Sequence, residues 1–240
     1  MSPDLFATNH RGTRVPRTLG FLLGGAALLA TVARGGVGRE GWAATTALLV
    51  VLTVGVIDDL APQVARGIRG HLAALARGRP TTGVAKLVVI VAAAFVVAGA
   101  GRTAVAEALA GAVLIASSAN LGNALDVRPG RTLKVMTPLC LVGLLAPGGA
   151  QPYLPGLLVA LCPALALDLR ERAMLGDGGS NLVGFAAGVA LAAVLPLPWL
   201  AVAAAVAVGL TVLSEVVSLS AIIDGNAALR ALDRLGRLPD

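Results

Sequence analysis

The chain has 240 residues, of which 57% are hydrophobic and 13% are charged, and its mean hydropathy is +0.85. An average soluble domain carries about 25% charged residues, so this composition excludes an ordinary soluble protein and indicates an integral membrane protein. The net charge is +6 and the pI is about 10.6. A basic balance is also typical of nucleic-acid-binding proteins, but the positions of the cations argue against that function.

Eight apolar stretches are candidates for membrane-crossing helices, because such a helix needs about 20 mainly apolar residues. They cover residues 18–33, 41–57, 84–100, 103–121, 133–148, 152–167, 181–195 and 198–217. Several are short, which predicts tilted helices or local thinning of the bilayer. Glu107 falls inside the fourth stretch and Pro147 interrupts the fifth. The first stretch also resembles a signal peptide, but we interpret it as an uncleaved anchor.

The predicted fold is therefore an all-α, polytopic bundle of about eight transmembrane helices. It forms one integral membrane domain over residues 1–240, with an N-terminal segment at 1–17 and a C-terminal tail at 218–240. Ala, Gly and Val dominate the spans, and small residues let helices pack closely in lipid. In the tail, LRALDRLGR (229–237) is at most a cytoplasmic amphipathic helix.

The distribution of Lys and Arg predicts the orientation of the bundle. Every second connecting segment is basic, whereas the opposite segments hold only Arg34, Arg39 and Arg102. Both termini are therefore predicted to lie in the cytoplasm, and the protein is predicted to be a multi-pass protein of the plasma membrane. Because topology accounts for the basic residues, no nucleic-acid partner is expected.

An acidic pair ends the second predicted span, where Asp58 and Asp59 close the run GVIDDL. Carboxylates at membrane depth are costly and usually functional, and adjacent ones repel each other. Mg²⁺ would remove this repulsion, because it takes a few carboxylates together with waters and phosphate oxygens. The alternative is a simple cap at the water interface. The negative end of the helix dipole disfavours carboxylates there, so we favour a metal-linked function.

Polar and basic residues follow the fourth span in SSANLGNALDVRPGRTLK (117–134). Three polar residues recur every three positions and three cations come after them: Asn120, Asn123 and Asp126, then Arg128, Arg131 and Lys134. At a helical end the three polar residues would share one face. They would hold the waters of a metal or sugar hydroxyls, and the cations would neutralise phosphates. The alternatives are hydrogen bonds between helices for the asparagines, and topology or lipid contact for the cations.

A glycine-rich segment, MLGDGGSN (174–181), precedes the seventh span and carries Asp177. Ser180 or Asn181 is expected to cap the seventh helix, whose free N–H groups would bind a phosphate. The alternative is a plain interfacial turn. Since Asp58, Asp59, Asp126 and Asp177 end different helices on one predicted side, we expect the bundle to bring them together.

Four motifs in this order resemble those of the polyprenyl-phosphate N-acetylhexosamine-1-phosphate transferase superfamily. They are NHRGTRVPRTLG (9–20), GVIDDL (55–60), NLGNALD (120–126) and MLGDGGSN (174–181). The resemblance implies transfer of a sugar-1-phosphate from a UDP-sugar to a polyprenyl phosphate, with release of UMP. It also implies a part in making cell-envelope polysaccharide or peptidoglycan precursors, a site on the cytoplasmic face, and Mg²⁺ as cofactor, with Mn²⁺ as the alternative ion. A homodimer is left open.

The resemblance assigns roles to the residues of these motifs. Asp58, Asp59 and Asp126 match catalytic carboxylates, and Asp177 matches a direct Mg²⁺ ligand that Asp59 or Asp58 would assist. The residues expected to bind substrate are Asn120, Asn123, Arg128, Arg131, Lys134, Ser180 and Asn181.

Two other functions remain open at this stage. The chain has no His-rich segment after MLGDGGSN, a feature of the family, and its only histidines are His10 and His71. This favours a catalytically degenerate membrane scaffold or lipid-phosphate-binding protein of an envelope assembly. A small transporter is the third alternative, but transporters carry charges or broken helices at mid-span, whereas the acids here cluster at span ends.

Overall fold

The computed structural model describes residues 4–35, 38–62, 67–100, 102, 104–146 and 151–239. Over these residues the fold is helical apart from one short antiparallel hairpin, in which Phe6 pairs with Pro16. The elements are β1 (Phe6–Thr8), β2 (Arg14–Pro16), α1 (Leu19–Ala33), α2 (Arg39–Leu60), α3 (Gly67–Ala76), α4 (Thr82–Ala100), α5 (Val105–Leu125), α6 (Arg131–Leu145), α7 (Leu154–Leu169), α8 (Gly176–Val194), α9 (Leu197–Val216), α10 (Leu219–Gly225) and α11 (Ala227–Arg234).

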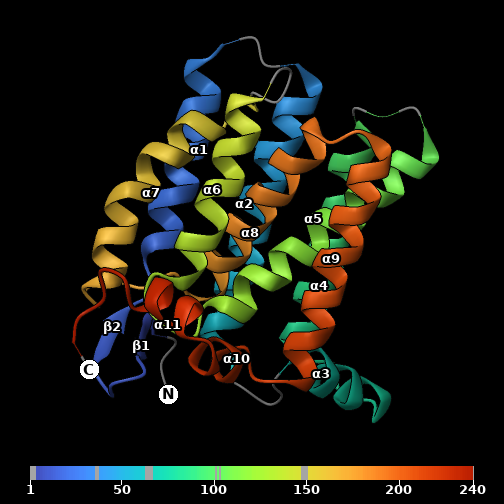
Figure 1. The fold of residues 1–240 in the computed structure, drawn as a ribbon. Coiled ribbons are helices and arrows are strands. Elements are labelled where there is room, and N and C mark those ends of the chain that lie inside the picture. Colours follow the sequence, from blue (N-terminus) through green and yellow to red (C-terminus); the bar gives the residue numbers. More distant parts are fainter. Residues whose placement is uncertain are drawn as a thin grey trace.

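The long helices run side by side as a bundle, and each predicted span corresponds to one of them (Figure 1). Within the described residues, five are long and apolar enough to cross a membrane: α2, α4, α5, α8 and α9. α1 and α7 are shorter apolar helices. The all-α bundle is therefore confirmed and its membrane character is supported, while the number of crossings and their orientation stay predictions. The predicted start at 103 and the end at 148, with Pro147, lie outside the described residues.

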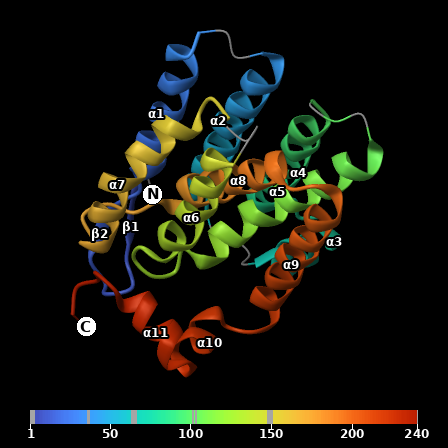
Figure 2. The ribbon, with the colours of Figure 1, turned by 45° about the horizontal axis from the view of Figure 1, so that its top comes forward.

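Helix α8 forms the centre of the bundle and packs against α1, α2, α5 and α6 (Figures 1 and 2). Its neighbours approach closely because glycines face each other across the contacts. A Cβ added at Gly55 of α2 would lie 2.6 Å from the Cα of Gly178, and one at Gly20 of α1 would lie 2.9 Å from the Cα of Gly179. Small residues thus bring the end of α2 against the start of α8, as close packing in lipid requires.

One end of the bundle carries the hairpin, α3, α10, α11 and both ends of the described chain (Figure 1). The first and last segments are in contact there, since Arg11 Nη2 donates to the carbonyls of Leu238 at 2.9 Å and Pro239 at 2.7 Å. The hairpin is anchored to the segment before α8, because the N–H of Met174 donates to the carbonyl of Pro16 at 2.9 Å. The predicted tail helix is present as α11, which ends at Arg234, and its cytoplasmic location stays a prediction.

Candidate functional site

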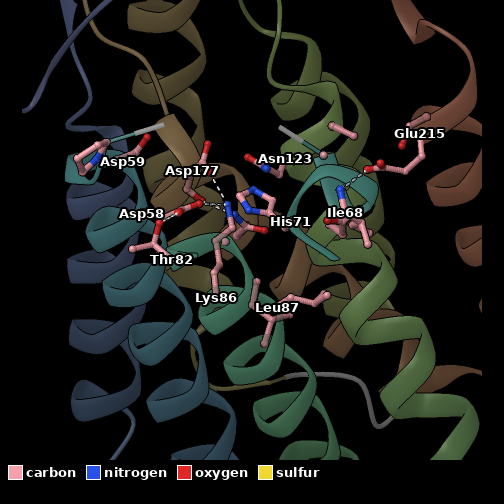
Figure 3. Close-up of a pocket in the computed structure, with 18 residues that line it drawn as sticks. Asp58, Asp59, Ile68, His71, Thr82, Lys86, Leu87, Asn123, Asp177 and Glu215 are labelled. Atoms are coloured by element: carbon pink, nitrogen blue, oxygen red, sulfur yellow. Dashed lines mark hydrogen bonds and ion pairs between the residues drawn. The ribbon is translucent and has the colours of Figure 1, made fainter. Parts of the chain in front are cut away.

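A cluster of polar side chains lies around a cavity of about 370 Å³. Residues of α2, α4, α5 and α8 line it, and α3 and α9 close its side (Figure 3). Six residues singled out in the sequence line this cavity: Asp58, Asp59, Asn120, Asn123, Asp177 and Asn181. The packing of α2 and α5 around α8 brings these residues, which are far apart in the sequence, into one place.

A lysine lies between two of the aspartates (Figure 3). Lys86 Nζ is 2.6 Å from Asp58 Oδ2 and forms a second ion pair with Asp177. Thr82, one turn earlier on α4, donates its hydroxyl to Asp58 Oδ1 at 2.5 Å. The side chains of Asp58 and Lys86 are each 12% exposed, whereas that of Asp177 is 35% exposed. Asp177 is therefore the most open member of this trio.

Asp59 is held differently from its neighbour. Its Oδ1 is 3.0 Å from Arg17 Nη1, and its Oδ2 accepts a hydrogen bond from the N–H of Gly178 at 3.3 Å. Gly176 turns the chain beside it with φ +64°, and a Cβ there would lie 2.6 Å from Asp59 Oδ2. This position needs glycine for both its backbone conformation and its space. Asp59 thus joins the end of α2 to the start of α8, whereas Asp58 is linked to Asp177 through Lys86.

The start of α8 differs from the sequence prediction. The helix begins at Gly176, so Ser180 and Asn181 lie inside it and the prediction that one of them caps it is wrong. Asn181 Nδ2 donates to the carbonyl of Asp177 at 2.6 Å, and Ser180 Oγ donates to Asn123 Oδ1 at 3.1 Å. As a result Asp177 sits in the first turn, where the positive end of the helix dipole favours a carboxylate.

Asp126 does not share the helical face of Asn120 and Asn123. It follows the last residue of α5 with φ −77° and ψ 44°, so the helical face shared by Asn120 and Asn123 ends before it. It lines a second cavity of about 290 Å³ with Arg128 and His10. Burial, together with the carboxylates of Asp168, Asp177 and Asp59, raises the pKa of Asp126 well above its usual range. Asp126 therefore lies beside the central cavity but outside its lining.

Two predicted phosphate ligands are turned away from the central cavity. Arg131 is buried and pairs with Asp233 through Nε at 2.7 Å and Nη2 at 3.1 Å. Lys134 Nζ donates to the carbonyl of Asp233 at 2.7 Å. Both side chains hold α11 against α6 and do not line the central cavity, so their role as ligands of a substrate phosphate stays a prediction.

Three titratable residues that line the central cavity were not singled out from the sequence: His71, Lys86 and Glu215. His71 Nδ1 is 2.7 Å from the hydroxyl of Thr81. Glu215 accepts the backbone N–H groups of Ile68 at 2.9 Å and Arg69 at 3.3 Å, and so caps α3. Lys86 lies in the predicted span 84–100 and in α4, which begins at Thr82. A charge inside a candidate span is itself a signal of function.

The donor set fits a divalent cation that arrives with phosphates. Among the described residues, no group of three or more His, Cys, Asp or Glu side chains is arranged as a metal cage. Mg²⁺ does not need one, since it is usually held by one or two carboxylates with waters and substrate phosphates. Asp58 and Asp177 already converge on one positive charge, that of Lys86. These two oxygen donors suit a hard cation better than a soft one.

No protein-family model matches the sequence, and a comparison with curated proteins found no match. The proposed function is therefore based on the sequence motifs and on the geometry of the described residues.

Proposed function

We propose that this protein transfers a sugar-1-phosphate from a UDP-sugar to a polyprenyl phosphate in a Mg²⁺-dependent reaction and releases UMP. The proposal includes membership of the superfamily that the four motifs resemble. It also includes location in the plasma membrane, with the central cavity on the cytoplasmic side and both termini in the cytoplasm. The same cavity chemistry accommodates Mn²⁺ as an alternative ion.

The observation that carries the proposal is the arrangement of Asp58, Lys86 and Asp177 around one polar cavity at the ends of candidate membrane helices. Four carboxylates line this cavity, because Asp59 and Glu215 join the two that pair with Lys86. An excess of negative charge repels phosphates unless a cation is present. A polar site of this kind, which we predict to lie at the depth of the lipid head groups, suits a reaction between a lipid phosphate and a soluble nucleotide.

In the proposed step, an oxygen of the lipid phosphate attacks the β-phosphorus of the UDP-sugar in line. A new P–O bond forms, the bond to the bridging oxygen breaks, and UMP leaves with the electron pair. Mg²⁺ bound by Asp177 and Asp58 would neutralise the charge on the phosphates. Such transfers depend on positioning and electrostatics more than on covalent catalysis by the protein.

The other side chains around the cavity have separate roles in the proposed reaction. Lys86 donates to phosphate oxygens, and little base catalysis is required because the second pKa of the acceptor phosphate is near 6. Asn120, Asn123 and Asn181 offer amides to sugar hydroxyls. Asp59 positions Gly178 and the first turn of α8 through its hydrogen bond at 3.3 Å.

The test is to incubate the purified full chain with undecaprenyl phosphate, Mg²⁺ and a panel of UDP-sugars and to measure released UMP. We expect release with at least one donor, and a loss of about 100-fold or more in Asp177→Asn, because a charge-stabilising group is removed. Glu107→Gln is the matched control, since it removes a carboxylate beside the cavity of about 310 Å³ that Arg102 and Glu40 also line. Full activity in Asp177→Asn would reject the role of Asp177.

A second function is favoured by one observation, namely that Lys86 forms ion pairs with both Asp58 and Asp177. A lipid-phosphate-binding scaffold of an envelope assembly needs a fixed cation and no turnover. This alternative predicts binding of undecaprenyl phosphate without UMP release from any donor. Lipid binding without UMP release would support the scaffold function and reject the transferase function.

A further inference from the structure

A second group of charged side chains lies apart from the central cavity, between the turn that joins α5 to α6 and the C-terminal helices. It surrounds a pocket of about 200 Å³ whose lining consists only of charged residues. They are Arg128, Asp224, Arg230, Asp233, Arg234 and Arg237. Arginines thus outnumber carboxylates two to one at this pocket, which the proposed transfer reaction does not use.

The pocket is held in shape by ion pairs at its base. Asp233 is 8% exposed and accepts hydrogen bonds from Arg131 and from Arg237, the latter at 2.6 Å. Arg230 Nη1 donates to the carbonyl of Asp224 at 2.5 Å. Asp233 serves two guanidinium groups, and the lining as a whole holds four arginines against two carboxylates. The pocket therefore keeps a positive potential in a preformed shape.

Arginines at this pocket also act electrostatically on His10 in the N-terminal segment. Burial lowers the pKa of His10 and the Glu171 carboxylate raises it, while the guanidinium groups of Arg128, Arg237 and Arg11 lower it, so that the net direction is downward. Cations from both ends of the chain and from the α5–α6 turn thus gather at one end of the bundle. A group of several guanidinium groups is the arrangement that binds phosphate through paired hydrogen bonds.

The surroundings of the pocket indicate which phosphate it would meet. Leu229 and Leu232 are 42% and 63% exposed, and Leu235 and Leu238 after the helix are 68% and 43% exposed. On α11, Leu229 and Leu232 are three residues apart and share one side, whereas Arg230 and Arg234 are four apart and share another. Exposed leucines opposite arginines are typical of a helix that lies in the membrane interface. A soluble phosphate would not require these leucines.

We propose that this pocket binds the phosphate group of an anionic phospholipid through Arg128, Arg230 and Arg234, with the leucines of α11 and its C-terminal extension inserted among the lipids. α10 and α11 lie at the end of the bundle that also carries α3 (Figures 1 and 2). The head group would then fix the C-terminal helices on the membrane surface. This inference is independent of the transfer reaction.

The test uses the full chain in detergent, titrated with phosphatidylglycerol, phosphatidylcholine or inorganic phosphate while bound lipid is counted by native mass spectrometry. Arg230→Gln/Arg234→Gln is compared with Arg77→Gln/Arg79→Gln, which removes two exposed cations near the turn between α3 and α4. We expect the pocket variant to bind phosphatidylglycerol at least about tenfold more weakly, because charge-assisted hydrogen bonds are lost. The control variant is expected to bind as the parent does. Arg128→Gln gives an independent check, since it leaves α11 unchanged.

Three results would overturn the proposal. Equal weakening in the pocket and control variants would mean general attraction of anionic lipid to a basic protein. Equal binding of phosphatidylcholine and phosphatidylglycerol would mean that the head-group charge is not recognised. Binding of inorganic phosphate as tight as that of the lipid would assign the pocket to a soluble phosphate.

Discussion

Lys86 is the residue on which the central cavity depends. It joins carboxylates from α2 and α8 and lies one turn inside α4. Its pairing with two carboxylates was not visible in the sequence, although a charge inside the predicted span 84–100 is itself a signal of function. The acids were easier to find, since Asp58, Asp59 and Asp177 stand at the ends of long apolar runs. The sequence did not show which residue would pair with each of these acids.

We predict that Lys86→Met destabilises the metal-free protein by about 2 kcal/mol, because it leaves two carboxylates facing each other without a counter-ion. Adding Mg²⁺ should raise the unfolding temperature of the variant more than that of the parent, since the ion no longer competes with an ammonium group. Thermal unfolding in EDTA and in Mg²⁺ measures both effects. Arg79→Met is the control for loss of an exposed cation, and equal Mg²⁺ shifts in Lys86→Met and the parent would contradict the prediction.

At the scale of elements, the apolar runs predicted where the long helices lie, because length and hydrophobicity alone decide which segments can cross a bilayer. The start of α8 was predicted wrongly, since Gly-Asp-Gly-Gly is typical of a turn. Here the glycines continue a helix whose neighbours pack too closely for side chains, as at Gly55 and Gly178. The hairpin and α3 were missed as well. Their short lengths gave no periodic pattern strong enough to detect.

The ion pair between Arg131 of α6 and Asp233 of α11 should make the free energy of unfolding depend on pH. Burial would raise the pKa of Asp233, but hydrogen bonding to Arg131 and the charges of Arg131 and Arg237 lower it below the ordinary value of 3.8. A carboxylate with a lowered folded pKa stabilises the protein above its unfolded pKa, and this stabilisation is lost as the pH falls through the folded value. We therefore expect Asp233→Asn to unfold at a lower temperature than the parent at pH 6.

The difference between parent and Asp233→Asn should shrink once the pH falls below about 4, where the unfolded chain begins to bind the proton. Unfolding temperatures measured from pH 7 to pH 3 test this, and Asp224→Asn serves as the exposed control. A difference that stays constant over the whole range would show that Asp233 acts through packing rather than through its charge.

For the whole molecule, the basic segments predict one orientation, which stays a prediction. The two ends of the described chain, the hairpin and α3 lie at the same end of the bundle. The apolar pattern therefore anticipated the bundle, whereas the assembly of the central cavity from α2, α4, α5, α8 and α9 depends on contacts between distant residues that no local pattern records.

Labelling of single cysteines tests this orientation in cells. The native thiols, buried Cys140 and exposed Cys162, are first replaced by Ala and Ser. We then expect a membrane-impermeant reagent to label Gly38→Cys on intact cells, because the turn before α2 faces outward on the predicted topology. Arg79→Cys, in the turn between α3 and α4, should react only after permeabilisation. The reverse pattern would invert the bundle and move the central cavity to the outer surface.

The contact between Arg11 and the carbonyls of Leu238 and Pro239 joins the beginning of the chain to its end, and Glu215 reaches back from α9 to cap α3. A ribosome delivers these pieces in order, so the early helices enter the bilayer long before their last partners exist. The polar cavity of the nascent bundle therefore stays incomplete until α9, which supplies Ser214 and Glu215 to its lining, has been made.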